Sequence, residues 1–267
     1  MSSKTLSLKE FDELGGRKEV ATLLLQMIGD EDLGAMDLAK VAGGDPILSA
    51  KVMRMANSAY YGLSGVVKDL QFAISVIGLL ALRSVTVSAM IDQLVPISKD
   101  VWRRFLGAAG LAAELSSYFD ADQGESICAG MVMDLGELVL AHHDLRGYSL
   151  LHREISKVPI YLRGQLAAIR EEQIYGKSHM DLSAELLSMW QFPDEIVDSV
   201  RYHHKLREND TPLSRCLYST ASVMPYLMES KIEIEHDLEL PEEVMYANWV
   251  EIRDRMNRFV EDTLPSF

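Results

Sequence analysis

The sequence predicts an all-α protein. Apolar residues recur at three- and four-residue intervals along most of the chain, and no alternating run bounded by hairpin turns argues for strands. With 267 residues, of which 48% are hydrophobic, the chain can bury a substantial core. No repeat of 20 to 50 residues stands out. A helical solenoid is therefore disfavoured, and a globular helical body in two lobes is expected.

Two helices open the first lobe. Lys18–Ile28 carries apolar residues on one face, and Gly29-Asp30 ends that pattern. A short amphipathic helix follows, and the glycine pair Gly43-Gly44 ends it.

The third helix has clear start signals. Asp45 can accept hydrogen bonds from the free N–H groups of a first turn, and Pro46 suits the first helical position. Lys51 and Arg54 are expected to face water. The residues expected on the buried side are Leu48, Val52 and Met55.

The centre of the molecule is expected to hold the most apolar segment. A helix is predicted from Asp69 to Gly78, since glycine tolerates the left-handed turn that closes helices. Leu79–Met90 is then apolar on nearly every face, which is typical of a central helix. Pro96 breaks the pattern before a helix over Val101–Tyr118.

Helical periodicity continues in the second lobe. The acidic stretch 229–243 is expected to be a solvated loop or to include a short strand-like piece. The predicted helices are Glu125–Ala141, Tyr161–Tyr175, Leu182–Trp190, Asp194–His203, Pro212–Leu227 and Glu242–Asp262.

These elements suggest three parts of the chain. An N-terminal segment, 1–16, precedes a main domain over 17–210, and a C-terminal helical extension over 211–267 is expected to pack on that domain. The break around Pro96 divides the main domain into lobes at about 17–97 and 98–210.

Charge and cysteine content restrict the partners and the compartment. The formal net charge of −14 opposes binding to a phosphate backbone, so no nucleic-acid partner is expected. Cys128 and Cys216 are too few for a disulfide framework and form no C-x-x-C pair. No segment reads as a signal peptide or a membrane span. A cytoplasmic protein without a membrane partner is expected.

Three stretches carry a family resemblance: GGDPILSAKVMRMANSAYYG at 43–62, VVKDLQFAISVIGLLALRSV at 66–85 and HMDLSAELLSMWQFPDEIVDSVRYHH at 179–204. In sequence and spacing they resemble the HDOD family, the bacterial signalling modules related to HD phosphohydrolases. The resemblance covers Arg17–Leu206. It implies an all-α HD-domain-like fold, with an N-terminal helical lobe packed on a degraded HD-like lobe.

The resemblance also identifies what is missing. Catalytic HD domains hold a metal with a histidine on one helix, a His-Asp doublet on the next and a later aspartate; the metal then generates hydroxide from water. The doublet position here reads Met133-Asp134, and Val101–Tyr118 contains no histidine. Glu137 stands where related hydrolases commonly have lysine. No metal ligand, no cofactor and no catalytic residue is therefore expected.

Four residues are expected to mark the vestigial pocket. By resemblance, Asp134, His179, His203 and His204 lie near the old cleft and can converge there. Two simpler interpretations stay open. A histidine on an apolar helix face is often a satisfied core residue, and Asp134 can be a hydrogen-bonded turn residue beside Met133 in the core.

The NSAYYG stretch has two interpretations. Asn57 can end a helix in the left-handed conformation and Gly62 permits the next turn, which is a structural explanation. Asn57, Tyr60 and Tyr61 also form a candidate interaction surface, since tyrosines offer large amphipathic contact areas.

The sequence thus favours a noncatalytic regulatory protein that binds an unidentified signalling protein or a small effector. The alternative is a metal-dependent phosphohydrolase with a rearranged site, in which a spare histidine or Glu137 moves protons. A nucleotide sensor lies between the two, provided that Arg103, Arg104 or Arg201 lines the cleft.

Overall fold

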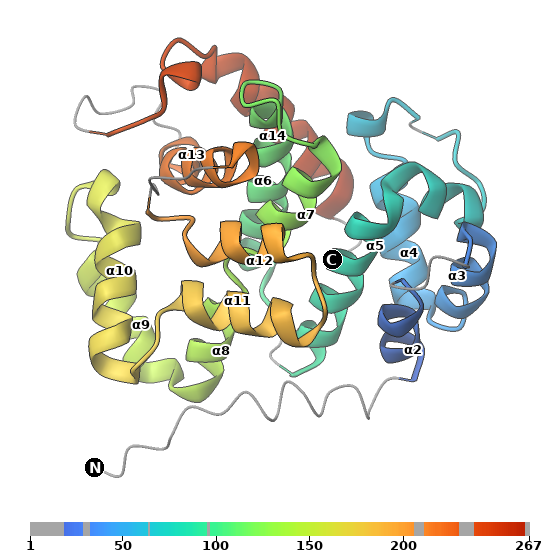
Figure 1. The fold of residues 1–267 in the computed structure, drawn as a ribbon, viewed down its shortest axis with the longest axis horizontal. Coiled ribbons are helices and arrows are strands. Elements are labelled where there is room, and N and C mark those ends of the chain that lie inside the picture. The colour runs from blue at the N-terminus through green and yellow to red at the C-terminus, as the bar shows by residue number, and fades with distance from the viewer. Residues whose placement is uncertain are drawn as a thin grey trace.

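The computed structural model describes residues 19–28, 33–63, 65–94, 97–205, 211–229 and 238–264. All the regular elements within these ranges are helices, as the sequence predicts (Figure 1). The predicted N-terminal segment 1–16 and most of the acidic stretch lie outside the described residues.

The first lobe consists of α2 (Glu19–Met27), α3 (Ala35–Ala42), α4 (Pro46–Ala56), the 3-10 turn η2 (Ala59–Tyr61) and the first part of α5 (Leu70–Leu94).

The remaining helices build the second lobe and its C-terminal extension. In chain order they are α6 (Lys99–Ser116), α7 (Gln123–Val132), α8 (Leu135–His143), α9 (Leu145–Ile155), α10 (Ile160–Tyr175), α11 (His179–Met189), α12 (Asp194–Arg201), α13 (Pro212–Met228), the 3-10 turn η3 (Glu242–Val244) and α14 (Trp249–Thr263).

Helix α5 joins the two lobes. Its Gly78 has φ 79° and ψ 169°, outside the helical region, so α5 consists of two helical parts that meet at a kink where the sequence predicts a helix end, and the second part continues to Leu94. Helix α5 packs against α2, α3 and α4 and also against α7 (Figure 1). The stretch Leu70–Ala89 is long and apolar enough to cross a membrane, but 67% of it is buried within the fold, which fits a core helix.

One prediction about α4 is wrong. Leu48, Val52 and Met55 are buried as expected and Arg54 is exposed, but Lys51 is only 2% exposed. Its Nζ lies 4.4 Å from the centre of the Trp102 ring on α6. The long aliphatic stem crosses the apolar lobe junction, and the ammonium group meets the negative face of an indole. The helical pattern does not report this distant aromatic partner.

The second lobe departs from the prediction in two places. The single helix expected over Glu125–Ala141 is two helices, α7 and α8, which are interrupted at Met133-Asp134. Helix α9 was not predicted at all. Its signals were present, since Asp144 caps it by accepting from the Gly147 N–H, and its buried residues recur at three- and four-residue spacing. Those residues are Tyr148, Leu151 and Ile155.

The C-terminal helices complete the core. Helix α13 packs against α6, α7, α10 and α12, and α14 packs against α6, α4 and η2. Cys216 and Leu217 on α13 and Phe259 on α14 belong to one hydrophobic cluster that also contains residues of the first lobe. The helices after residue 211 therefore pack on the main body, and α13 also reaches the cleft described below.

The packing of α4 leads to a stability prediction. Val52 is 0% exposed, so Val52→Asp places an unpaired charge in the core and should lower the free energy of unfolding by about 3 kcal/mol or more. Arg54→Ala, on the exposed side, should stay within about 0.5 kcal/mol of the parent. Chemical denaturation followed by circular dichroism measures both. Similar losses for the two variants would contradict this assignment of the helix faces.

Candidate functional site

The break between α7 and α8 brings Asp134 to the surface of a cleft. Met133 before it is buried in the core, and Asp134 occupies the first turn position ahead of α8. The Gly136 N–H donates to the Ser183 hydroxyl at 2.8 Å. A Cβ on Gly136 would lie 2.1 Å from the His179 carbonyl oxygen, so only glycine lets α8 approach the start of α11 this closely. This contact places Asp134 beside His179.

His179 is the first residue of α11, and hydrogen bonds to α10 fix its position. Ser178 and Asp181 form a capping box that fixes where the helix begins. Both the His179 backbone N–H and its Nδ1–H donate to Oε2 of Glu171 on α10, at 2.7 and 2.6 Å. The other Glu171 oxygen, Oε1, accepts from the Tyr148 hydroxyl at 3.0 Å. The Nε2 atom of His179 therefore points away from α10, toward Asp134.

His203 and His204 follow α12 directly and approach from the opposite side. The Nδ1–H of His203 donates to the Val200 carbonyl at 2.6 Å, which leaves Nε2 directed at Asp134, 3.4 Å from Oδ1. The His204 ring packs against Gly164, where a Cβ would lie 2.3 Å from the ring. The rings of His203 and His204 have centroids 4.3 Å apart.

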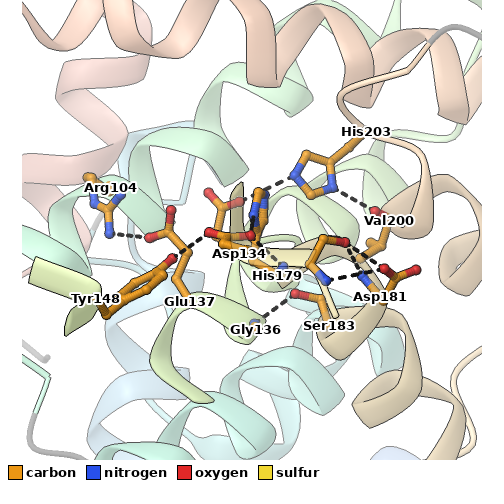
Figure 2. A network of polar contacts seen from close by, with 12 residues as sticks. Arg104, Asp134, Gly136, Glu137, Tyr148, His179, Asp181, Ser183, Val200 and His203 are labelled. Atoms are coloured by element: carbon orange, nitrogen blue, oxygen red, sulfur yellow. Dashed lines mark hydrogen bonds and ion pairs between the residues drawn. The ribbon is translucent and has the colours of Figure 1, made fainter. Parts of the chain in front are cut away.

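The structure thus brings together all four residues of the predicted vestigial pocket. One ligand atom from each of Asp134, His179, His203 and His204 lies within 4.8 Å of the others. Figure 2 shows His179 and His203 directed at Asp134 from different elements. The Nε2 atoms of His179 and His203 are buried and have no hydrogen-bond partner. Buried polar atoms of this kind need an explanation, such as an ordered water or a bound ion.

Burial and neighbouring charges shift the pKa values of three residues in the cluster: His179, His204 and Asp134. Burial lowers the pKa of His179, but the Glu171 carboxylate outweighs burial and raises that pKa to about 9. Burial and the neighbouring histidines hold the pKa of His204 well below its usual value, so this ring stays neutral. Burial raises the pKa of Asp134, but its interactions with His203, and then with His179 and Arg104, hold that pKa well below its usual range. Asp134 is therefore a carboxylate at neutral pH.

Arg104 on α6 occupies the side of the site where the resemblance implies a histidine. It forms an ion pair with Glu137 at 2.7 Å, and the side chain of Glu137 is only 13% exposed (Figure 2). Of the three arginines considered from sequence, Arg104 alone lines the cleft. Arg103 pairs with Asp100 on α6, and Arg201 lies 3.6 Å from Asp181.

Three residues of the cluster, Asp134, His179 and His204, line a cleft of about 290 Å³, and His203 is buried behind them. One wall is polar and includes Arg104, Asp134 and His179; the other comes from α13 and is mainly apolar. Arg163 on α10 pairs with Glu229 at the end of α13, at 2.5 Å, beside the same cleft. The apolar wall consists of Ala221, Met224, Pro225 and Met228.

Sequence reasoning missed Glu171 and Tyr148. Glu171 is completely buried, and it lies on the same side of α10 as the buried Ala167 and Ala168. A carboxylate three and four residues from buried alanines is a usable signal, because a buried acid requires a partner. Tyr148 lies on α9, the helix that the sequence analysis did not predict.

The NSAYYG corner is tied into the fold. The Asn57 side chain makes hydrogen bonds with the Met53 carbonyl and with both backbone groups of Val67. Tyr60 packs edge-on against Phe259 of α14, with ring centroids 5.4 Å apart, and Tyr61 packs against Tyr60. Both rings are half-buried, so α14 covers part of the predicted interaction surface.

These features define a helical HD-like protein with a histidine-rich cleft. The HDOD domain matches residues 16–206, and the chain belongs to the HDOD family. An uncharacterized protein of Treponema pallidum (strain Nichols) is 20% identical over 186 residues, which cover 67% of this chain. The match spans only 35% of that relative's length.

Solved structures support the same fold. A protein of Shewanella amazonensis SB2B, provisionally named a phosphohydrolase, has a TM-score of 0.70 at 18% identity over 93% of both chains. A provisionally named signal transduction protein of Marinobacter aquaeolei VT8 has a TM-score of 0.65 at 20% identity, covering 92% of this chain and 59% of that one. An HDOD domain protein of Geobacter sulfurreducens has a TM-score of 0.56 at 18% identity, covering 94% and 89%.

The close approach at Gly136 yields a second prediction. Gly136→Ala forces the α8 and α11 backbones apart and should lower the free energy of unfolding by about 2 kcal/mol, a typical penalty for overpacking. Gly34→Ala is the matched control, because a Cβ at Gly34 would meet nothing within 4 Å and the φ of −99° suits any residue. Denaturant titration of both variants measures the difference. An unchanged stability for Gly136→Ala would show that this contact is looser than the structure indicates.

Proposed function

We propose that this chain is a noncatalytic HDOD signalling module that acts by binding, with the cleft around Asp134 as the site for a small effector. The observation that carries the proposal is the doublet position. Met133 borders the cleft but is only 2% exposed, and its thioether cannot transfer a proton and is a poor ligand for the divalent metals that imidazole and carboxylate hold. The neighbouring cation, Arg104, is already engaged by Glu137.

The coordination available in the cleft also favours binding over catalysis. Asp134 and the three histidines supply four protein donors, which is enough to fill a tetrahedral metal shell. Catalytic sites for such metals usually have three protein ligands and keep one position open for water. A closed shell suits a structural or sensing centre.

A second candidate is a metal-dependent phosphohydrolase, favoured by the four clustered donors beside a cleft. The residues fit a metal, because the Nε2 atoms of His179 and His203 are buried, have no hydrogen-bond partner and are directed at Asp134. A bound divalent metal would lower the pKa of water and polarise a phosphoryl group. Arg104 would then have to exchange Glu137 for the substrate anion.

A protein partner is the other half of the proposal. The acidic chain favours partners with basic surfaces, and such association weakens as salt rises. Tyr60 and Tyr61 remain the candidate contact residues, with α14 forming one border of that surface. A partner there would contact the first lobe and the C-terminal helix together.

The noncatalytic assignment predicts the absence of turnover. Protein loaded with manganese, iron, nickel or zinc should hydrolyse 4-nitrophenyl phosphate and bis(4-nitrophenyl) phosphate no faster than Asp134→Ala treated in the same way. Release of nitrophenol measures the rate. Metal-dependent hydrolysis that Asp134→Ala abolishes, in a variant shown to be folded, would establish the phosphohydrolase candidate instead.

A further inference from the structure

Glu171 is a buried carboxylate whose two oxygens are both occupied. Its side chain is 0% exposed; Oε2 accepts two hydrogen bonds from His179, and Oε1 accepts one from Tyr148. A carboxylate removed from water is strongly unfavourable unless it is paired and hydrogen-bonded. The fold accommodates it with residues from three helices, α9, α10 and α11. Such a group needs an explanation beyond packing.

The effect of Glu171 on His179 is geometric. Because Nδ1–H donates to the carboxylate, the unprotonated nitrogen of the neutral ring is Nε2. The bond from the His179 backbone N–H to the same oxygen holds the Glu171 carboxylate against the start of α11, and the ring can turn only by giving up its Nδ1 bond to that carboxylate. Nε2 is thereby directed at the cluster and is buried without a hydrogen-bond partner, and it becomes a lone-pair donor when its proton is released as a metal binds.

His203 is prepared in the same way by a different group. Its Nδ1–H donates to the Val200 carbonyl, and its buried Nε2 also lacks a hydrogen-bond partner. Metal-bound histidines almost always donate their other ring N–H to a carboxylate, a backbone carbonyl or water. Both supports occur here, one on each side of Asp134. Imidazole nitrogens with one carboxylate oxygen suit divalent transition metals such as zinc, cobalt and nickel.

We propose that Glu171, held in place by Tyr148, is the positioning residue that prepares His179 to bind a divalent transition metal with Asp134, His203 and His204. This inference rests on the cleft being the binding site of the proposed function, and it names the ligand class of that site. It revises the expectation from sequence that no metal is held. That expectation considered the lost doublet histidine; three later histidines meet Asp134 instead.

Cobalt(II) titration of the full chain tests the proposal, because cobalt reports both affinity and coordination. The wild-type protein should bind one equivalent with the visible absorption of a four-coordinate nitrogen and oxygen site. Glu171→Gln keeps the size of the side chain but removes its charge, and it should weaken cobalt binding about 10- to 100-fold, the usual effect of losing such a support. Tyr148→Phe should weaken it by a smaller factor.

Glu172→Gln is the matched control, since Glu172 is the exposed neighbour of Glu171 on the same helix and the charge change is identical. Its cobalt affinity should equal that of the wild type. Thermal unfolding without metal separates folding from positioning: a folded Glu171→Gln with weakened binding supports the proposal. If Glu171→Gln does not fold, Tyr148→Phe decides, because it removes one hydroxyl and keeps the ring.

Two results would overturn the proposal: a wild-type protein that binds no cobalt, or folded Glu171→Gln and Tyr148→Phe variants that bind cobalt as tightly as Glu172→Gln. Either result leaves a noncatalytic binding module intact. Conversely, hydrolysis by the metal-loaded protein would end the noncatalytic assignment and leave the role of Glu171 standing. The two proposals can therefore fail separately.

Discussion

The contact between α8 and α11 at Gly136 is the constraint on which the rest of the site depends. With no side chain at this position, the two backbones meet, and the Ser183 hydroxyl accepts from the Gly136 N–H that the new helix leaves free. The helix must therefore restart at Leu135, and Asp134 is left at the break, where its carboxylate reaches the cleft. A continuous helix through this region would carry Asp134 elsewhere and separate it from His179.

Charge in the cleft is balanced by partners built into the protein. Arg104 has Glu137, Arg163 has Glu229, and His179 has Glu171. Burying each charge beside its opposite reduces the desolvation penalty and also limits which ligands can enter. The Nε2 atoms of His179 and His203 have no hydrogen-bond partner, and each can bind a metal cation once it carries no proton. Local pairing therefore selects the chemistry of the site more strongly than the net charge of the chain does.

The sequence predicted the helical class and the family, because helical periodicity and the three matching stretches are local properties. It also named the four residues that meet in the cleft, although only by resemblance. Local patterns do not reveal distant partners. Lys51 looked like a surface residue because Trp102 is far away in sequence, and Glu171 was missed because its partners Tyr148 and His179 lie on other helices. The break at Asp134 was missed because it depends on how closely α11 approaches.

The buried Lys51 also bears on how the chain can be divided. Its ammonium group belongs to the first lobe and the Trp102 indole to the second, so the two lobes share a buried cation–π contact. A fragment ending near residue 97 would expose the buried surface around Lys51, and the complementary fragment would expose the one around Trp102. Neither surface is suited to water. The lobe boundary predicted near residue 97 is thus a poor place to divide the chain. The two lobes are best expressed as one unit.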